Sequence, residues 1–472
     1  MATISSAAGA IDVQGIVSQL MSVERQPLQA LQTTASGINT KLSAVGRVQS
    51  ALSNLQSAAR DLTNLSNWQQ VTASSSDETA VKATTSTGAV AGVYDVTVNQ
   101  LAQRQTLASS SFTASDTVIG GGTLSIQLGS YSSGTNTFTG VGTAVSVTVA
   151  ADSTLSQVRD AINATSGTGV SASIVDDGTG SRLVLRSTAT GAKNSVSMTV
   201  VDSDGNNTDS TSGLSRLAFD PTKAAGSGKN LTQTQAAQDA SVTISGLTVT
   251  SSTNTVSGAI ENVSLDLRKA GTGNTSITVS TNTTAMRGII DKFVSAWNDV
   301  NSNLNVATSY NAETKVAGPL QGNNTFIGLQ RQLKTLVSSS LSGGDLTRLS
   351  DAGIEVQRDG SLRANGTKLD PFLATPDKLK YLFANSSSTN SSLNGIARQM
   401  DTLITSVLGS GGAIPAAQDA LKTRQTQNTD AQASLKVRLT AIEKRLTDQY
   451  SAVNKNISEI SGAASSLISK FG

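Results

Sequence analysis

Residues 435–471 read LKVRLTAIEKRLTDQYSAVNKNISEISGAASSLISKF, a long polar segment with one narrow apolar stripe. The stripe positions recur every three or four residues, and their mean spacing of about 3.6 is the repeat of an α-helix. A helix of this length spans roughly 55 Å. Because an isolated helix gains most of its stability from packing, this stripe requires a partner helix. Its members are Leu435, Leu439, Ile442, Leu446, Tyr450, Val453, Ile457, Ile460, Ala464, Leu467 and Phe471.

The N-terminal part of the chain carries a matching pattern. Residues 11–26 predict a short helix with Asp12 as its N-cap. Pro27 predicts an end or a kink at Gln26, because a residue that precedes proline disfavours the α conformation. A second stripe over residues 28–62 steps by nearer 3.4 residues, which favours a supercoiled pairing. The apolar positions are Val13, Ile16, Val17, Leu20 and Val23, then Leu28, Leu31, Leu42, Val45, Leu52 and Leu55 among others.

From about Val71 the apolar period changes to two, which is typical of β-strands. Within this middle part, residues 153–192 predict a short helix and a hairpin. Thr154 and Gln157 form the sequence pattern of a capping box, and the turn Asp176–Gly180 joins two alternating segments. Helical spacing returns near residue 285, where Ile290, Phe293 and Trp297 share one face.

The order of helices, strands and helices predicts an α+β fold in which a β-rich part is inserted between two helical ends. We expect an elongated chain with a coiled-coil-like helical leg, built from both chain ends and residues 285–408, and β head domains. The expected divisions are terminal amphipathic segments 1–38 and 441–472, disordered when free; a leg of 39–70 and 284–440; a proximal head of 71–116 and 232–283; and a distal head of 117–231.

Composition excludes several classes of function. The 472 residues include no cysteine and no histidine, which removes disulfides, thiol nucleophiles, and thiolate or imidazole metal sites. The net charge of +2 and the lack of a basic run disfavour nucleic acid binding. No apolar run has the roughly 18 residues of a membrane span, and residues 1–10 lack the pattern of a secretory signal. We expect no enzyme activity, no cofactor and no metal.

Three short motifs resemble chemical sites and fail as such. Gly226–Asn230 lacks the first glycine and the hydroxyl of a phosphate loop. Asp202–Gly205 has its glycine at the wrong position for a calcium loop, and Gly213 stands where a bidentate glutamate belongs. Asp176 and Asp177 are paired carboxylates in a hairpin loop, where aspartate is a common turn former. We interpret all three as loops.

The helical stripes carry the one substantial functional hypothesis. The alternative is ordinary pairing within the chain, which we weigh for residues 40–66 with 420–440. For residues 11–35 and 440–471 we predict contacts with other molecules, since no equally long helix is left for both outer segments. The predicted contact residues are Val13, Ile16, Val17, Leu20, Val23, Leu28, Leu31, Tyr450, Val453, Ile457, Ile460, Leu467 and Phe471. The predicted leg core is Leu42, Val45, Leu52, Leu55, Ile290, Phe293, Trp297, Leu435, Leu439 and Ile442.

Residues 11–28, IDVQGIVSQLMSVERQPL, closely resemble the N-terminal signature of the flagellar filament-capping family, the hook-associated protein 2 family. Other blocks resemble the same family, so the similarity covers nearly the whole chain; the match over 440–471 is one of pattern. These blocks are Leu265–Gly271 leading into Thr278–Ser280, Phe293–Asp299, Gly318–Leu320, and Asp351–Ile354 with Asp359, Gly360 and Leu362. The unit at 153–192 resembles a repeat found in flagellins and hook–filament junction proteins.

This resemblance implies a structural cap at the distal tip of the bacterial flagellum. It implies a closed ring of identical subunits, for which we expect a pentamer, that retains flagellin and promotes its folding and polymerisation. It also implies export without a cleavable signal by the flagellar type III route, with an export chaperone in the cytoplasm. The further partners it implies are flagellin, the filament tip and the hook–filament junction proteins, without membrane insertion.

Other functions remain open from the sequence. A flagellin or junction protein of the same export class is disfavoured by the signature at 13–28 and by the helical block at 285–408. A surface adhesin with a helical stalk needs no free amphipathic segments at both ends. A carboxylate hydrolase of surface glycans lacks a convincing acid pair.

Overall fold

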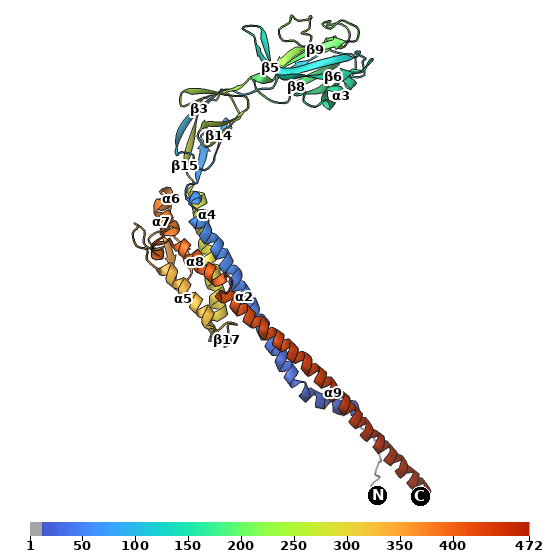
Figure 1. Cartoon of the computed structure of the whole chain (residues 1–472), viewed down its shortest axis with the longest axis vertical. Helices are drawn as coiled ribbons and strands as arrows, with labels where there is room; N and C mark the ends of the chain where they lie inside the picture. The colour runs from blue at the N-terminus through green and yellow to red at the C-terminus, as the bar shows by residue number, and fades with distance from the viewer. Residues whose placement is uncertain (1–11, 472) are drawn as a thin grey trace. The chain divides into compact units, whose positions relative to one another are not determined.

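The computed structural model describes residues 12–471, without the side chains of Lys470 and Phe471. The chain divides into two compact units (Figure 1). One is helical and joins the chain up to Trp68 with the chain from Thr283 onward; the other is β-rich and spans Gln69–Asn282. The predicted α+β fold, with strands inserted between helical ends, is confirmed. Of the expected N-terminal segment, the part before residue 12 lies outside the described residues.

The helical unit contains short and long helices and two small hairpins. Its helices are α1 (Val13–Glu24), α2 (Gln26–Thr63), α4 (Thr283–Thr308), α5 (Asn324–Ser338), α6 (Gly366–Ala374), α7 (Asp377–Ala384), α8 (Ile396–Leu408) and α9 (Ala413–Phe471), with single 3₁₀ turns at Leu65–Trp68 and Ser391–Leu393. Its hairpins are β16 (Tyr310–Asn311) with β17 (Val316–Ala317), and β18 (Ile354–Val356) with β19 (Leu362–Ala364).

The helix ends follow from local chemistry. Asp12 accepts a hydrogen bond of 2.9 Å from the amide of Gly15, as the sequence predicts for an N-cap. The helix is interrupted at Arg25, which lies between α1 and α2, and Pro27 occupies the first turn of α2. The N-cap position of α7 is held by Pro376. Proline fits there because the first turn leaves its amides unpaired.

The main core of the helical unit lies between α2, α4, α5, α7 and α8. Trp297 is fully buried, and its indole Nε1 donates a 2.9 Å hydrogen bond to the carbonyl of Gly360 in the turn between β18 and β19. Phe383 contacts Phe293 edge to face, and its ring stacks on Trp68. Of the predicted leg core, Val45, Leu52, Leu55, Ile290, Phe293 and Trp297 are buried here, and Leu42 is partly buried.

The β-rich unit has fifteen strands in its described sheets and one α-helix, α3 (Leu155–Ala164). The strands are β1 (Val71–Ser75), β2 (Val81–Thr85), β3 (Gly92–Gln100), β4 (Thr106–Ala108), β5 (Gly122–Ser132), β6 (Thr137–Val149), β7 (Val170–Asp176), β8 (Ser181–Ser187), β9 (Ser195–Asp202), β10 (Thr232–Gln235), β11 (Ala240–Ile244), β12 (Leu247–Ser251), β13 (Thr255–Ile260), β14 (Val263–Leu267) and β15 (Asn274–Thr281).

These strands surround two separate cores. The first lies between a five-stranded sheet, β1-β15-β3-β11-β12, and a three-stranded sheet, β13-β14-β2. The second lies between the sheets β10-β4-β8-β7 and β6-β5-β9, with α3 against β7 and β6. Strands that are far apart in the sequence lie side by side. The strand β1 pairs antiparallel with β15, from Val71 opposite Thr281 to Ser75 opposite Ile277. In each core, strands from an early part of the insertion pair with strands from a late part, as β4 does with β10 in the second core.

The unit at 153–192 forms as predicted. The hydroxyl of Thr154 accepts from the amide of Gln157, and the Gln157 side chain accepts from the amide of Thr154 at 2.9 Å, which completes the capping box. The hairpin of β7 and β8 closes at Asp176–Ser181. The Asp176 carboxylate accepts from the amide of Gly178 at 2.9 Å, as a turn former does.

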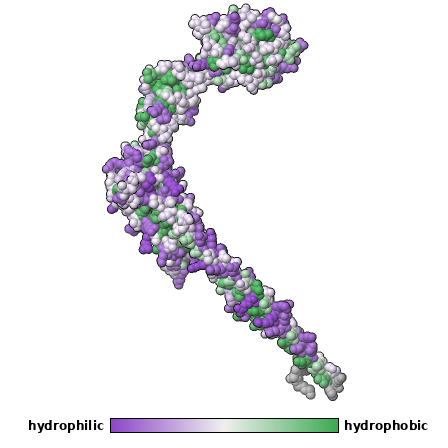
Figure 2. All heavy atoms as spheres, in the orientation of Figure 1, coloured by the Kyte–Doolittle hydropathy of each residue, from purple (hydrophilic) through white to green (hydrophobic). Residues whose placement is uncertain are grey.

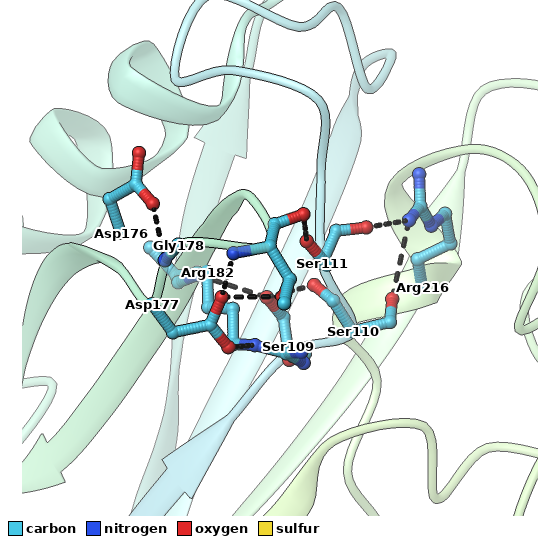
Figure 3. A network of polar contacts seen from close by, with 10 residues as sticks. Ser109, Ser110, Ser111, Asp176, Asp177, Gly178, Arg182 and Arg216 are labelled. Carbon is cyan, nitrogen blue, oxygen red and sulfur yellow. Dashed lines mark hydrogen bonds and ion pairs between the residues drawn. The ribbon is translucent and has the colours of Figure 1, made fainter.

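Polar contacts fasten this hairpin turn to the segment at Ser109–Ser111 (Figure 3). The Thr179 hydroxyl and the Arg182 Nε both donate to the Asp177 carboxylate, and they hold the pKa of Asp177 well below its usual range. Arg182 also donates to the carbonyl of Ser109 at 3.1 Å. The carboxylates of this loop are thus engaged in structure.

Candidate interaction surface

The two outer helices form a small apolar cluster of their own. Val17 and Met21 of α1 are buried against Leu439 of α9, with Met21 only 1% exposed. Around these three pack Val13, Leu28, Leu435, Ile442, Leu446 and Tyr450. This cluster, which we call the α1–α9 cluster, lies apart from the main core of the helical unit.

The α1–α9 cluster corrects two sequence expectations. We expected contacts with other molecules because no equally long helix is left for both outer segments, but α9 is long enough to pair with α2 first and with α1 farther along. Leu435, Leu439 and Ile442 were expected in the leg core and belong to this cluster instead. The physical reason is the break at Arg25, which lets α1 turn its apolar side onto α9. That these segments are disordered in the free chain stays a prediction.

Where α2 meets α9, amide side chains replace apolar ones. Gln418 donates to Gln49 at 2.5 Å, and Gln425 donates to Asn39 at 2.7 Å. The buried side chain of Asn428 donates to the carbonyl of Leu31 at 3.1 Å. Such polar contacts fix the register of a helix pair at some cost in stability. The apolar stripes of the sequence do not predict these cross-helix contacts.

The junction between α1 and α2 carries an ion pair to the opposite helix. The Arg25 guanidinium lies 3.3 Å from the Glu443 carboxylate, and both side chains are about half exposed. Exposed pairs of this kind contribute roughly 0–1 kcal/mol. The pair orients α1 more than it stabilises it.

Beyond Tyr450 the stripe of α9 lies open. Val453 is 45% exposed, Ile460 69% and Leu467 58%, while Ile457 is partly buried. Figure 2 shows green apolar atoms between purple polar ones along the terminal helices. Apolar side chains repeated along one helix face and left in water are typical of an interaction surface. We call Val453, Ile457, Ile460 and Leu467 the exposed α9 stripe.

The structure thus places the predicted contact residues in different surroundings. Val13, Val17, Leu28 and Tyr450 take part in the α1–α9 cluster. Ile16 and Leu31 are partly buried, whereas Leu20 and Val23 on α1 are exposed, at 40% and 62%. The exposed α9 stripe accounts for four more residues, and of Phe471 only the backbone is described.

The loops that resemble chemical sites are occupied by backbone contacts. Asp202 accepts from the amide of Ser215 at 2.7 Å, so its carboxylate closes a loop. The carbonyl of Lys229 accepts from the amide of Gly226 at 3.3 Å within a turn. Across residues 12–469, no group of three or more acidic, cysteine or histidine side chains is placed to hold a metal ion. None of the helices in this described stretch is long and apolar enough to cross a bilayer.

Comparisons with known proteins match both helical ends and the β-rich part. The C-terminal model of flagellar hook-associated protein 2 matches residues 237–462, and its N-terminal model matches residues 9–105. The flagellin hook IN motif matches residues 135–189. The A-type flagellar hook-associated protein 2 of Pseudomonas aeruginosa is 30% identical over 97% of this chain and 95% of its own length. The chain belongs to the flagellar hook-associated protein 2 family.

Other members of this family agree in length and fold. Flagellar hook-associated protein 2 of Escherichia coli strain K12 is 29% identical over 100% of this chain and 98% of its own. The crystal structure of the D1-D2-D3 domains of the flagellar cap protein FliD from Escherichia coli is 30% identical, with a TM-score of 0.59. It covers 80% of this chain and 99% of that one. The family resemblance drawn from residues 11–28 is therefore confirmed.

Met21 offers a test of the α1–α9 cluster. We expect Met21→Asp to release α1 from α9, because a carboxylate cannot be buried there without a partner. Amide hydrogen exchange over residues 13–24 should accelerate at least tenfold, while exchange in α4 and α8 stays unchanged. Ser22→Asp is the matched control, since Ser22 is exposed on the same helix. Equal exchange in both variants would show that the cluster does not hold α1.

Proposed function

We propose that this protein is the structural cap at the distal end of a bacterial flagellar filament. The observation that carries the proposal is the exposed α9 stripe in a chain of this family. Burying an aliphatic side chain contributes roughly 1.5–3 kcal/mol. Four such residues give the helical end enough association energy to hold another helix without any bond chemistry.

The cap would act by contact and templating. Several copies would form a closed ring through head-to-tail contacts, because a rotation that closes gives a finite assembly. Five is the number that we propose. The β-rich units would cover the tip and retain flagellin, and the helical ends would reach flagellin subunits of the filament. The polar contacts between α2 and α9 cost this helix pair some stability, so the two helices would separate more easily than an apolar pair. That would suit a helical end whose contacts with flagellin are made and released as subunits are added.

The same proposal covers assembly and location. The protein would leave the cell by the flagellar type III route, held before export by a chaperone, and would meet the hook–filament junction proteins when a filament starts. A chain without cysteine forms no disulfide that would hinder passage unfolded. Adhesion to host surfaces is a further role that the exposed tip position would allow.

Deletion of the gene tests the cap function. We expect the deletion strain to shed unpolymerised flagellin into the medium and to lose filaments. The full chain supplied in trans should restore the filaments and stop the shedding of flagellin, whereas a chain truncated after residue 450 should do neither. Normal filaments in the deletion strain would overturn the proposal and favour a surface adhesin. Loss of the hook–filament junction with filament fragments shed whole would favour a junction protein.

A further inference from the structure

Two segments of the chain connect the two β cores. Residues 101–105 lead from β3 of the first β core to β4 of the second, and residues 236–239 lead back from β10 to β11. The two cores have no buried apolar residue in common. Domains that meet through few and polar contacts are expected to move relative to each other. The residues around these connections therefore decide whether the β-rich unit moves as one body.

The two connecting segments pair with each other as a short ribbon. The amide of Gln103 donates to the carbonyl of Gln238 at 2.9 Å, and the amide of Gln238 donates to the carbonyl of Gln103 at 3.2 Å. A ribbon of two strands can bend and twist, because no third strand supports it. The ribbon is therefore a joint, and contacts outside it set how stiff this joint is.

Each β core anchors one end of the ribbon. On the side of the first β core, the side chain of Asn254 accepts from the amide of Ala102 at 2.7 Å and donates to its carbonyl at 3.1 Å. On the side of the second β core, the buried side chain of Gln105 accepts from the amide of Val196 at 2.5 Å. These anchors confine bending of this segment to residues 103–104.

The turn between β8 and β9, residues 188–194, reaches across the joint. The Thr190 hydroxyl donates to the carbonyl of Ser252 at 2.7 Å, and the Ala192 amide donates to the Asp239 carboxylate at 2.7 Å. The turn belongs to the second β core, whereas Ser252 follows β12 and Asp239 precedes β11 of the first. Two hydrogen bonds thus tie the cores together at a place where no chain connection runs.

Gly191 allows the turn to approach the first β core this closely. Its φ of +106° lies in the left-handed region, which glycine adopts without steric cost. A Cβ atom at this position would lie 2.7 Å from the Cβ of Ser252 and 3.0 Å from a carboxylate oxygen of Asp239. A side chain at residue 191 would therefore force the turn and the first β core apart.

We propose that the turn at 188–194 is a latch that locks the joint between the two β cores. When the latch is closed, it adds a contact beside the ribbon and makes the β-rich unit one rigid body. When the latch is open, the second β core is held by the ribbon alone and swings about residues 103–104. Because hydrogen bonds to protein and to water differ little in net free energy, the latch opens without unfolding either core. This device does not depend on the cap function.

Distances between two spin labels test the latch, because the native chain has no cysteine that would also be labelled. Thr248→Cys on β12 and Thr199→Cys on β9 place one label on each core, and both threonines are exposed. Pulsed electron paramagnetic resonance on the full chain should give one narrow distance distribution. Gly191→Val should open the latch and broaden this distribution at least about twofold, since the joint then moves freely.

Gly178→Val is the matched control for the glycine variant. Gly178 lies in the turn at the other end of β8 and also has a positive φ, +81°. A Cβ atom there would meet no atom of the described residues within 4 Å, apart from its own chain neighbours. Both variants strain a left-handed turn, but only Gly191→Val affects the latch. The distribution of Gly178→Val should match that of the labelled chain without either change.

Asp239 provides a second test that leaves the glycine in place. Asp239→Ala combined with Thr190→Val removes both cross-joint hydrogen bonds and should also broaden the distribution, whereas Asp239→Asn keeps an acceptor oxygen and should not. Circular dichroism of each variant should match that of the labelled chain, since both cores stay folded. A distribution that is already broad in the labelled chain, or that stays narrow in Gly191→Val and in the double variant, would overturn the proposal. Neither result alters the outcome of the gene deletion.

Discussion

Replacing Ile457 and Ile460 with aspartate is expected to abolish swimming and to leave the protein folded. Both residues belong to the exposed α9 stripe: Ile460 is 69% exposed, and Ile457 is partly buried but belongs to no core of the described chain, so the fold should persist. A carboxylate in place of each isoleucine removes roughly 1.5–3 kcal/mol of apolar burial per residue at the contact and adds a desolvation cost. The loss for the pair, about 3 kcal/mol or more, weakens binding at least a hundredfold.

The measurements are swimming on soft agar, filament length by electron microscopy and thermal unfolding of the purified variant. Ser458→Asp with Ser466→Asp is the matched control, because both serines are exposed on the opposite side of α9 and the added charge is the same. The control should swim normally. If the isoleucine variant also swims normally, the exposed α9 stripe makes no contact that assembly needs.

The periodic parts of this fold follow from the sequence because one face of each element decides them. The stripe of Phe293 and Trp297 fixed the buried side of α4, and the pattern of Thr154 and Gln157 fixed the start of α3. These sequence patterns are local, because a few neighbouring residues determine a helix cap or an apolar helix face. The existence of both helical ends and of the inserted strands was predictable on this ground.

The pairing of α1 was not predictable in the same way. It depends on the geometry of one residue, Arg25, and on how far α9 extends past the end of α2. Apolar periodicity tells which side of α1 is covered but not whether the cover comes from the same chain or another. The amide contact between Asn39 and Gln425 could not be predicted for a related reason. Glutamine and asparagine give no periodic signal, because the same residues also suit a solvated surface.

Trp297→Ala is expected to be the most destabilising single change in the helical unit. The side chain is 1% exposed, and truncation of a buried tryptophan costs about 3–5 kcal/mol. The change also leaves the carbonyl of Gly360 without its hydrogen-bond donor. This hydrogen bond holds the turn between β18 and β19 against α4. For a unit of this size, the midpoint of thermal unfolding should fall by roughly 10 °C.

The chain offers a selective reporter for this loss. Its two tryptophans, Trp68 and Trp297, both lie in the helical unit, so fluorescence of Trp68 in the Trp297→Ala variant follows that unit alone. Val306→Ala is the control, since Val306 is 65% exposed on the same helix and should shift unfolding by less than about 0.5 kcal/mol. Trp297→Phe should fall between the two, because it keeps most of the apolar volume and loses the hydrogen bond. A Trp297→Ala variant that unfolds at the temperature of the Val306→Ala control would show that the contact of α4 with the β18–β19 turn does not hold the helical unit together.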